Sequence, residues 1–193
     1  MAENCDPIKL ENIEFCPTDE IVAGLNDLEV YGAAVTDFET IAEPPKLNVA
    51  ANFEEAGSIA EAHTFKEGRG FHKIQIQADS GSVENTQLGE KGNLGVQNSL
   101  TGAMRNNKKT KGYLRYYKNV PMIYIVREKT GNLVQVGSKN SPAYIVEFTG
   151  NTGAAPGDPK NIQVIIRDSQ AYFAPDYEGA ITQFPAPAPD PEV

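Results

Sequence analysis

The residues best suited to chemistry in this chain are cations and aromatic rings gathered between residues 105 and 118. The run holds six basic side chains and no acid, with three tyrosines among them. Its cations are Arg105, Lys108, Lys109, Lys111, Arg115 and Lys118, and its rings are Tyr113, Tyr116 and Tyr117. Cations neutralise phosphate and aromatic rings stack on bases, so a nucleic-acid site would use this pattern.

The acidity of the rest of the chain offers this basic run a second kind of partner. The whole chain carries −9, so the residues outside the run sum to −15. Residues 1–61 hold fourteen acids against only Lys9 and Lys46, a net charge of −12. A basic patch on one copy could therefore meet the acidic region of another, and complementary charge favours correct partners. A solvated helix face is the third interpretation, and all three stay open at this point.

Motifs for catalysis, metals or cofactors are missing from the sequence. It has no nucleophile elbow, phosphate loop, zinc-protease or dinucleotide pattern. His63 and His72 do not combine with Cys5 or Cys16 at zinc-ligand spacing, so we expect ordinary packing or surface histidines. The glycines of residues 89–95 lack the Gly-Lys-Ser/Thr ending of a phosphate loop, which favours a hairpin connection. We therefore expect no enzymatic activity, no catalytic residue, no cofactor and no metal.

The length and composition indicate one soluble, globular domain. A chain of 193 residues with 40% hydrophobic and 22% charged residues can bury one core. No stretch approaches the roughly 20 apolar residues of a membrane helix, and the acidic N-terminus does not resemble a secretory signal. We expect a protein made in a cytoplasm, with both cysteines as thiols and no membrane partner.

The hydrophobic pattern predicts mainly β-structure. Ile74 and Ile76 alternate with Gln75 and Gln77 within residues 71–78, and residues 83–88 are predicted to return as the second strand of a hairpin. Residues 94–104 also alternate, and residues 122–127 and 133–136 flank a short turn. Further strands are expected at 28–35, 38–41, 143–149 and 162–167, with a loop over 150–159.

One helix is expected within the basic run, over roughly residues 107–118. On it Thr110, Tyr113, Leu114 and Tyr117 share one face, while the cations point outward. A second helix is possible over 54–62. The organisation expected is an acidic N-terminal arm over 1–23, one β-rich domain over 24–180 and a Pro-rich tail over 181–193.

The order of these elements resembles the tail tube proteins of tailed bacteriophages, particularly those of Bacteroidetes-type hosts. The resemblance runs from Gly24 to Gly179 and covers most of the chain. It is carried by residues 27–41, 70–81 and 92–100, by the helix and the hairpin that follows it, and by residues 137–143, 150–153 and 174–179. The acidic first twenty residues and the Pro-rich tail depart from the pattern. The quoted segments are structural and contain no catalytic fingerprint.

The resemblance implies a β-sandwich or barrel of antiparallel strands with one short flanking α-helix and extended arms. Such subunits form hexameric rings that stack into a tube, through which double-stranded DNA passes. The implied partners are further copies of the chain, tail completion proteins and tape-measure proteins, and the implied location is the virion tail. We expect the six cations to lie at a subunit interface and Gln75 and Gln77 to face the lumen.

Two other functions remain compatible with the same residues. One is a head-side or head–tail joining protein of the virion, which would decorate a particle and would not form a channel for DNA. The other is a soluble nucleic-acid-binding module that uses residues 105–118. Net acidity argues against general adhesion to nucleic acid, because like charges repel, although screening keeps that effect local.

Overall fold

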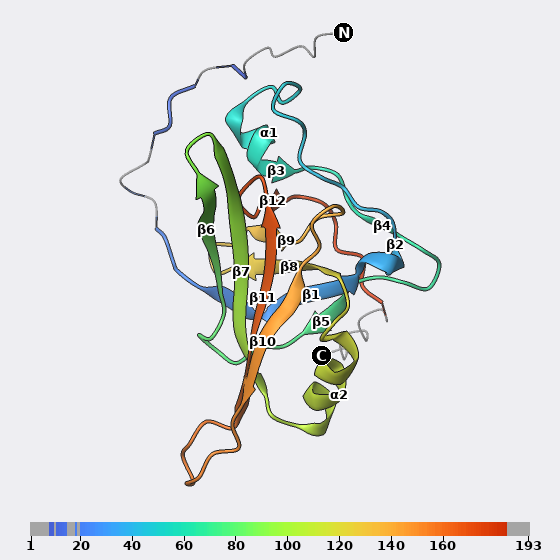
Figure 1. The fold of residues 1–193 in the computed structure, drawn as a ribbon, viewed down its shortest axis with the longest axis vertical. Coiled ribbons are helices and arrows are strands. Elements are labelled where there is room, and N and C mark those ends of the chain that lie inside the picture. The colour runs from blue at the N-terminus through green and yellow to red at the C-terminus, as the bar shows by residue number, and fades with distance from the viewer. Residues whose placement is uncertain (1–7, 10, 15–17, 19, 185–193) are drawn as a thin grey trace, which may run out of the picture.

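The computed structural model describes residues 8–9, 11–14, 18 and 20–184, and within them the chain is mainly β-structure. Two large sheets pack face to face, and a two-stranded sheet lies to one side (Figure 1). Within the described part neither large sheet closes into a barrel. The predicted class, a β-sandwich of mostly antiparallel strands with one short flanking helix, is confirmed. Cys5, Cys16 and residues 185–193 lie outside the described residues.

Six strands form the larger sheet, in the spatial order β3-β12-β9-β8-β1-β5. They are β1 (Leu25–Ala34), β3 (Ser58–Ile59), β5 (His72–Ile74), β8 (Met122–Glu128), β9 (Leu133–Val136) and β12 (Asp176–Tyr177). Neighbours run antiparallel except β3 and β12, which are parallel. Residues 122–126 of β8 are all buried, as expected for a strand covered on both faces. The predicted hairpin of β8 and β9 is confirmed.

Four antiparallel strands form the second sheet, in the order β10-β11-β7-β6. They are β6 (Ser82–Glu90), β7 (Asn93–Arg105), β10 (Tyr144–Gly150) and β11 (Asn161–Gln170). Along β7, alternate residues such as Val96 and Leu100 are buried, while those between them face outward. One face of this sheet therefore packs on the core and the other faces solvent. The loop predicted after residue 150 joins β10 to β11 and projects from the body (Figure 1).

The remaining elements are short. A 3-10 turn, η1 (Val35–Asp37), leads into β2 (Phe38–Thr40), which pairs with β4 (Thr64–Phe65). The helices are α1 (Phe53–Gly57) and α2 (Lys108–Tyr117). The longer helix is predicted correctly within a residue or two. The one over 54–62 is only a single turn, because β3 begins at Ser58 and pairs with β12. Within the described residues no helix is long and apolar enough to cross a membrane.

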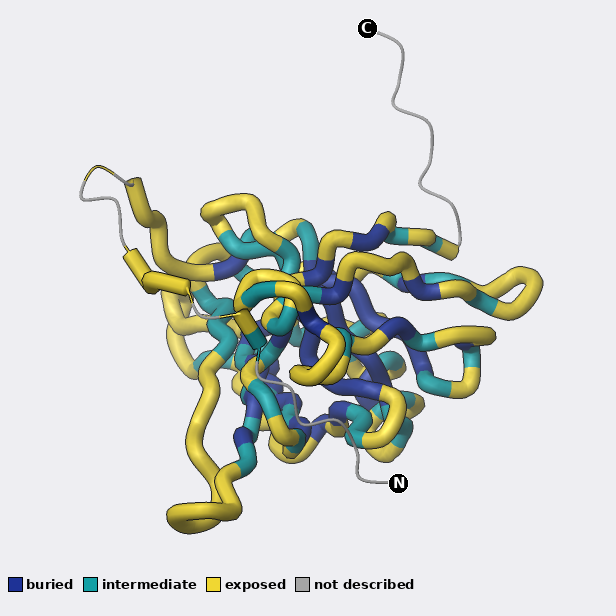
Figure 2. The backbone as a smooth tube through the Cα atoms, turned by 90° about the horizontal axis from the view of Figure 1, so that it is seen from above, coloured by how far each residue is buried: buried dark blue, intermediate teal, exposed yellow. Residues whose placement is uncertain are grey.

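The main core lies between the two large sheets, and Figure 2 shows its buried strands at the centre of the molecule. The larger sheet contributes Val30, Tyr124, Val126, Val134 and Val136, and the four-stranded sheet contributes Leu100, Met104, Ile162, Val164 and Ile166. Burial of each large side chain contributes about 1.5–3 kcal/mol. The three surface ion pairs of the described residues contribute much less, because solvent screens exposed charges. Packing between the sheets therefore dominates stability.

A second cluster covers the opposite face of the larger sheet. Tyr31, Ile123 and Ile125 point to this side and meet Phe38 and Phe71 from the segment that follows β1. The rings of Phe38 and Phe65 stack with centroids 4.4 Å apart. The larger sheet is therefore a middle layer, which explains why its central strands are apolar at consecutive positions.

The prediction that residues 71–78 and 83–88 form a hairpin is wrong. Strand β5 pairs with β1 in the larger sheet, whereas β6 pairs with β7 in the other sheet. Ile74 and Ile76 are buried as predicted, because the segment crosses from one sheet to the other with its apolar side toward the core. Local alternation identified the inward residues, but strand pairing depends on contacts distant in sequence.

A buried polar cluster joins the two sheets at Asp168 of β11. Its carboxylate accepts hydrogen bonds from the Gly137 backbone N–H and from Asn98 Nδ2, the latter at 2.8 Å. Asn98, which is fully buried, accepts in turn from the Ala174 N–H at 3.0 Å. Burial raises the pKa of Asp168 to about 6, although these donors oppose the shift. Gly137 follows β9 at φ 94°, and a Cβ there would lie 2.8 Å from the Met122 carbonyl oxygen.

We expect Asn98→Ala to lower the free energy of unfolding by about 2 kcal/mol, because it removes a donor from a buried carboxylate and an acceptor from the Ala174 N–H. Urea unfolding followed by circular dichroism measures the change. Thr86→Ala on exposed β6 is the matched control and should stay within about 0.5 kcal/mol of the parent. Equal effects of the two substitutions would show that the cluster does not join the sheets.

Candidate functional site

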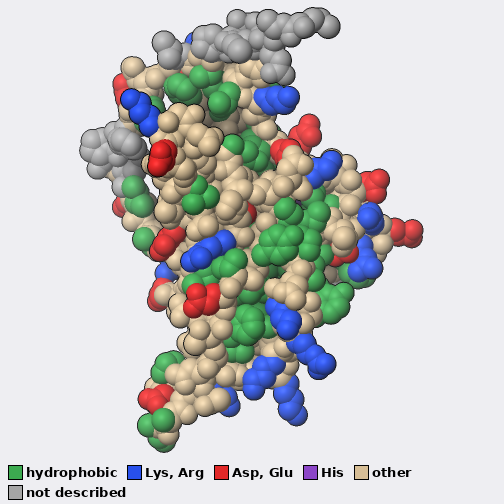
Figure 3. Space-filling view, viewed as in Figure 1, with side chains coloured by type: hydrophobic (Ala, Val, Ile, Leu, Met, Phe, Trp, Pro, Cys, Tyr) green, Lys and Arg blue, Asp and Glu red, His purple; other side chains and the backbone are tan. Residues whose placement is uncertain are grey.

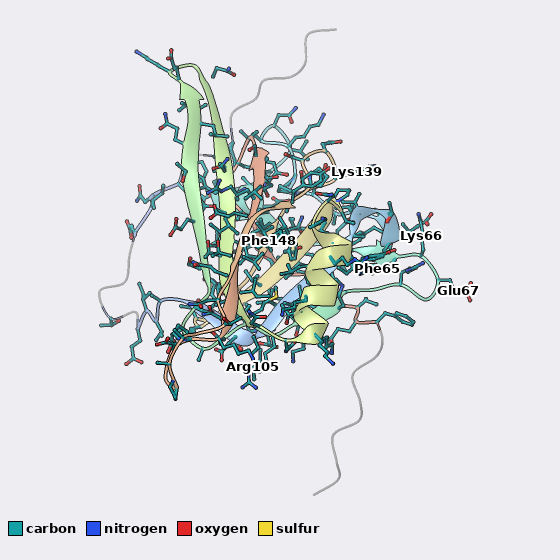
Figure 4. All side chains as sticks on the ribbon, turned by 60° about the horizontal axis from the view of Figure 1, so that its bottom comes forward. Phe65, Lys66, Glu67, Arg105, Lys139 and Phe148 are labelled. Atoms are coloured by element: carbon teal, nitrogen blue, oxygen red, sulfur yellow. The ribbon has the colours of Figure 1, made fainter. Side chains whose placement is uncertain are left out.

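The basic run is displayed on α2, at one end of the sandwich (Figure 1). The helix begins after Asn107, whose Oδ1 accepts from the Thr110 N–H at 2.8 Å. Leu114 is buried in the main core, and Tyr113 and Tyr117 pack against it. The predicted apolar face is thus confirmed. All six cations are exposed, with Arg105 at the end of β7 just before the helix (Figure 4).

His72 of β5 fixes the helix to the larger sheet. Its ring stacks on Tyr117 with centroids 5.2 Å apart, and its Nε2 lies 3.3 Å from the Tyr113 hydroxyl. Burial lowers the pKa of His72 to about 4, because the charged imidazolium is poorly solvated there. The histidine is therefore neutral at physiological pH and acts as a packing residue, as the sequence predicts.

The six cations have no acidic partner within the described residues. The ion pairs found there join Arg69 to Asp37, Arg127 to Glu29, and Lys129 to Asp79. Figure 3 shows the lysines and arginines gathered at the α2 end of the visible face. Several like charges held close together raise the local potential and attract an acidic partner. The site is thus a surface of uncompensated positive charge on an otherwise acidic chain.

A second candidate surface is the outer face of the four-stranded sheet. The residues of β7 and β11 that alternate with the buried ones point to this side. They are mostly uncharged and polar, with Gln97, Ser99, Thr101, Gln163 and Ser169 among them. The charged residues in this outward register are three acids, Glu84, Glu90 and Glu147, and two cations, Arg105 and Arg167, a net charge of −1. The face is broad, hydrated and close to neutral.

Both edges of this sheet are unpaired within the described residues. β10 forms one edge and β6 the other. On β10 three large apolar side chains are exposed: Tyr144 at 42%, Val146 at 50% and Phe148 at 51% (Phe148 is labelled in Figure 4). Strand edges with free backbone groups and apolar side chains are templates for pairing with another strand.

The predicted lumen residues lie away from the middle of this outer face. Gln75 is exposed and Gln77 is half-buried, in the crossover between β5 and β6. Gln77 is engaged inside the subunit, since its Oε1 accepts from Asn161 Nδ2 at 3.2 Å. The outer face of β7 and β11 was not singled out from the sequence, although the alternation of Gln97, Ser99 and Thr101 carried the signal.

His63 is a buried structural residue. Its Nδ1 accepts from the Ala42 N–H at 3.0 Å, and its Nε2 lies 2.8 Å from Gln135 Oε1. The ring also stacks on Tyr177. Both nitrogens are therefore occupied by protein groups, and burial lowers the pKa of this histidine. Among the described residues no three His, Cys, Asp or Glu side chains gather as a metal site would require.

We expect the docking of α2 to weaken in acid through His72. Its pKa is about 4 in the folded chain against 6.5 when unfolded, so the unfolded state takes up the proton first. Stability should be fully present above pH 6.5 and fall by about 3 kcal/mol as the pH drops from 6.5 to 4. His72→Phe keeps a ring but cannot titrate, so its unfolding free energy, measured in urea, should lack this decline. If the unfolding free energies of the two proteins declined in parallel with falling pH, His72 would not be the group responsible.

Comparison with known proteins identifies no relative: no family model, no curated protein and no solved structure matches the chain.

Proposed function

We propose that this chain is a non-enzymatic structural subunit that assembles into rings, stacked as the tail tube of a bacteriophage. The observation that carries the proposal is the four-stranded sheet, whose two edges are unpaired within the described residues and whose outer face is mostly polar. A sheet of this kind can be continued from copy to copy. The sequence resemblance to tail tube proteins points the same way.

The strand directions allow one copy to extend the sheet of the next. Because all three neighbouring pairs are antiparallel, the edge strands β10 and β6 run in opposite directions. When β6 of one copy meets β10 of another by rotation about an axis along the strands, the new pair is also antiparallel. Such head-to-tail contacts generate a ring when the rotation closes.

The ring would remove both open edges and enclose a channel. Six copies of four strands give 6 × 4 = 24 strands. Barrels of about 16–18 strands already leave an aqueous channel, so a barrel of this size is wide. Its inner wall would be the outer face of the four-stranded sheet, which is mostly polar and carries three acids against two cations. A wall of this kind hydrates a passing DNA duplex without binding its phosphates.

Negative-stain electron microscopy of the concentrated protein is the direct test, and we expect rings and stacked tubes with sixfold symmetry. If the micrographs showed isolated monomers and no rings at high concentration, the proposal would be wrong. Helical stacking of rings also separates a tube protein from a head–tail joining protein, which would form single rings or decorate a particle.

We expect the double substitution Val146→Lys/Phe148→Lys to abolish rings while the monomer stays folded. Both side chains are about half exposed in the free subunit, so the lysines mainly block edge pairing. The readouts are electron microscopy and the unfolding free energy. Phe173→Lys is the matched control, because Phe173 is 64% exposed but lies between β11 and β12, outside both edges. Rings from the double variant would exclude β10 as the joining edge.

A nucleic-acid-binding module is the second candidate, and the uncompensated cations of α2 beside exposed Tyr116 favour it. Replacing Lys108, Lys109, Lys111 and Arg115 by Gln distinguishes the two. Under the tube proposal this variant assembles poorly, and DNA binding is negligible before and after the change. A loss of DNA affinity with a flatter salt dependence would favour the module instead.

A further inference from the structure

An exposed position without a side chain lies on α2 at Gly112, and it is called the Gly112 notch below. The residues three and four positions away on the helix frame it: Lys108, Lys109, Arg115 and Tyr116. Apart from its two chain neighbours and the backbone of the helix itself, a Cβ at Gly112 would meet no described atom within 4 Å. Glycine is a poorer helix former than alanine, and no contact inside the subunit requires a missing side chain here. The helix therefore gives up stability and gains an open stretch of backbone between three cations and a ring.

The cations at the start of the helix also lower the stability of the helix. Lys108 and Lys109 are its first two residues, and no acid lies in the first turn. The helix macrodipole is positive at this end and favours acids. Departures from local rules without a gain inside the fold are expected at functional or strained sites. Together with the open glycine, they indicate that an acidic group from outside approaches the notch.

The segment of residues 11–22 has the matching chemistry. It contains Glu11, Glu14, Asp19 and Glu20 and no cation. Among its described residues, Ile13 is 78% exposed and Ile21 is 82% exposed. Acids of the folded domain are partly engaged already, since Glu29 and Asp37 form ion pairs. The segment before β1 therefore combines unburied apolar side chains with concentrated negative charge.

The placement of the two surfaces favours a contact between copies. The described residues of the segment lie on the flank of β6, whereas α2 lies beyond β10 on the opposite flank (Figures 1 and 4). Joining β6 of one copy to β10 of the next brings these flanks together. Gly24 is thirteen residue steps from Glu11, and an extended chain of that length reaches about 40 Å.

We propose that the Gly112 notch binds residues 11–22 of a second copy of this chain. The acids of the segment pair with Lys108, Lys109 and Arg115, and an isoleucine packs on Tyr116 where Gly112 leaves room. This inference rests on the proposed function and names the segment that ties adjacent subunits together.

Chemical cross-linking tests the contact with a cysteine of the chain itself. In a Cys5→Ser/Lys111→Cys variant, the thiols are Cys16 in the segment and the new one beside the notch. A short bismaleimide added to the assembled protein should give a ladder of covalent multimers on denaturing gels. Cross-links confined to single chains, or no cross-links, would overturn the inference.

Gly112→Leu, introduced in that background, separates docking from folding. The leucine should fill the notch and reduce the multimer yield at least tenfold, while the melting temperature of the free subunit stays equal or rises. Gly57→Leu is the matched control, because Gly57 also lies in a helix with no atom near its added Cβ, and its ladder should match the parent's. A full ladder from the Gly112 variant would refute the notch.

Charge reversal tests the pairing itself. Glu11, Glu14 and Glu20 changed together to Lys should abolish the ladder, and adding Lys108, Lys109 and Arg115 changed to Glu should restore it. Failure of the double reversal to restore it would count against these pairs. Excess duplex DNA should leave the parent's ladder unchanged, and displacement of the segment by DNA would identify the surface as a nucleic-acid site instead.

Failure of this inference is distinguishable from failure of the proposed function. Rings in electron micrographs without intermolecular cross-links overturn the docking of the segment and leave the tube proposal standing. Monomers without rings overturn both.

Discussion

Burial of the larger sheet on both faces is the constraint around which this molecule is organised. Its strands β1 and β8 carry apolar residues at consecutive positions, so neither face can be left in water. The four-stranded sheet covers one face and the segment from Phe38 to Phe71 covers the other. Because the inner face of the four-stranded sheet covers the larger sheet, only its polar outer face and its two edges are left for other contacts.

Function in this chain then follows from what the core does not use. Both His63 and Asp168 are committed to internal hydrogen bonds. Among the described residues, the features that stay available include the backbone groups of β6 and β10, the apolar side chains of β10 and the cations of α2. All of these suit contacts with other chains, which is why assembly is the function that we propose.

Backbone pairing and charge have different roles in such an assembly. Edge strands supply hydrogen bonds that any exposed strand could accept, so they contribute affinity with little selectivity. Charges contribute less energy in water but disfavour wrong partners. A basic helix on one flank and an acidic segment on the other would therefore determine which edge pairs with which. Backbone hydrogen bonds between the edges would supply most of the affinity.

The sequence by itself determined the β-rich class, the hairpin of β8 and β9, and α2 with its apolar and charged faces, because these depend on periodicity and turn residues within about 20 positions. It also indicated the inward side of residues 71–78. Only the tertiary structure decided that β5 and β6 belong to different sheets, and that Asn98, Asp168 and Gly137 form one buried cluster. Such pairings join residues far apart in the chain, and no local pattern encodes which strand an edge will meet.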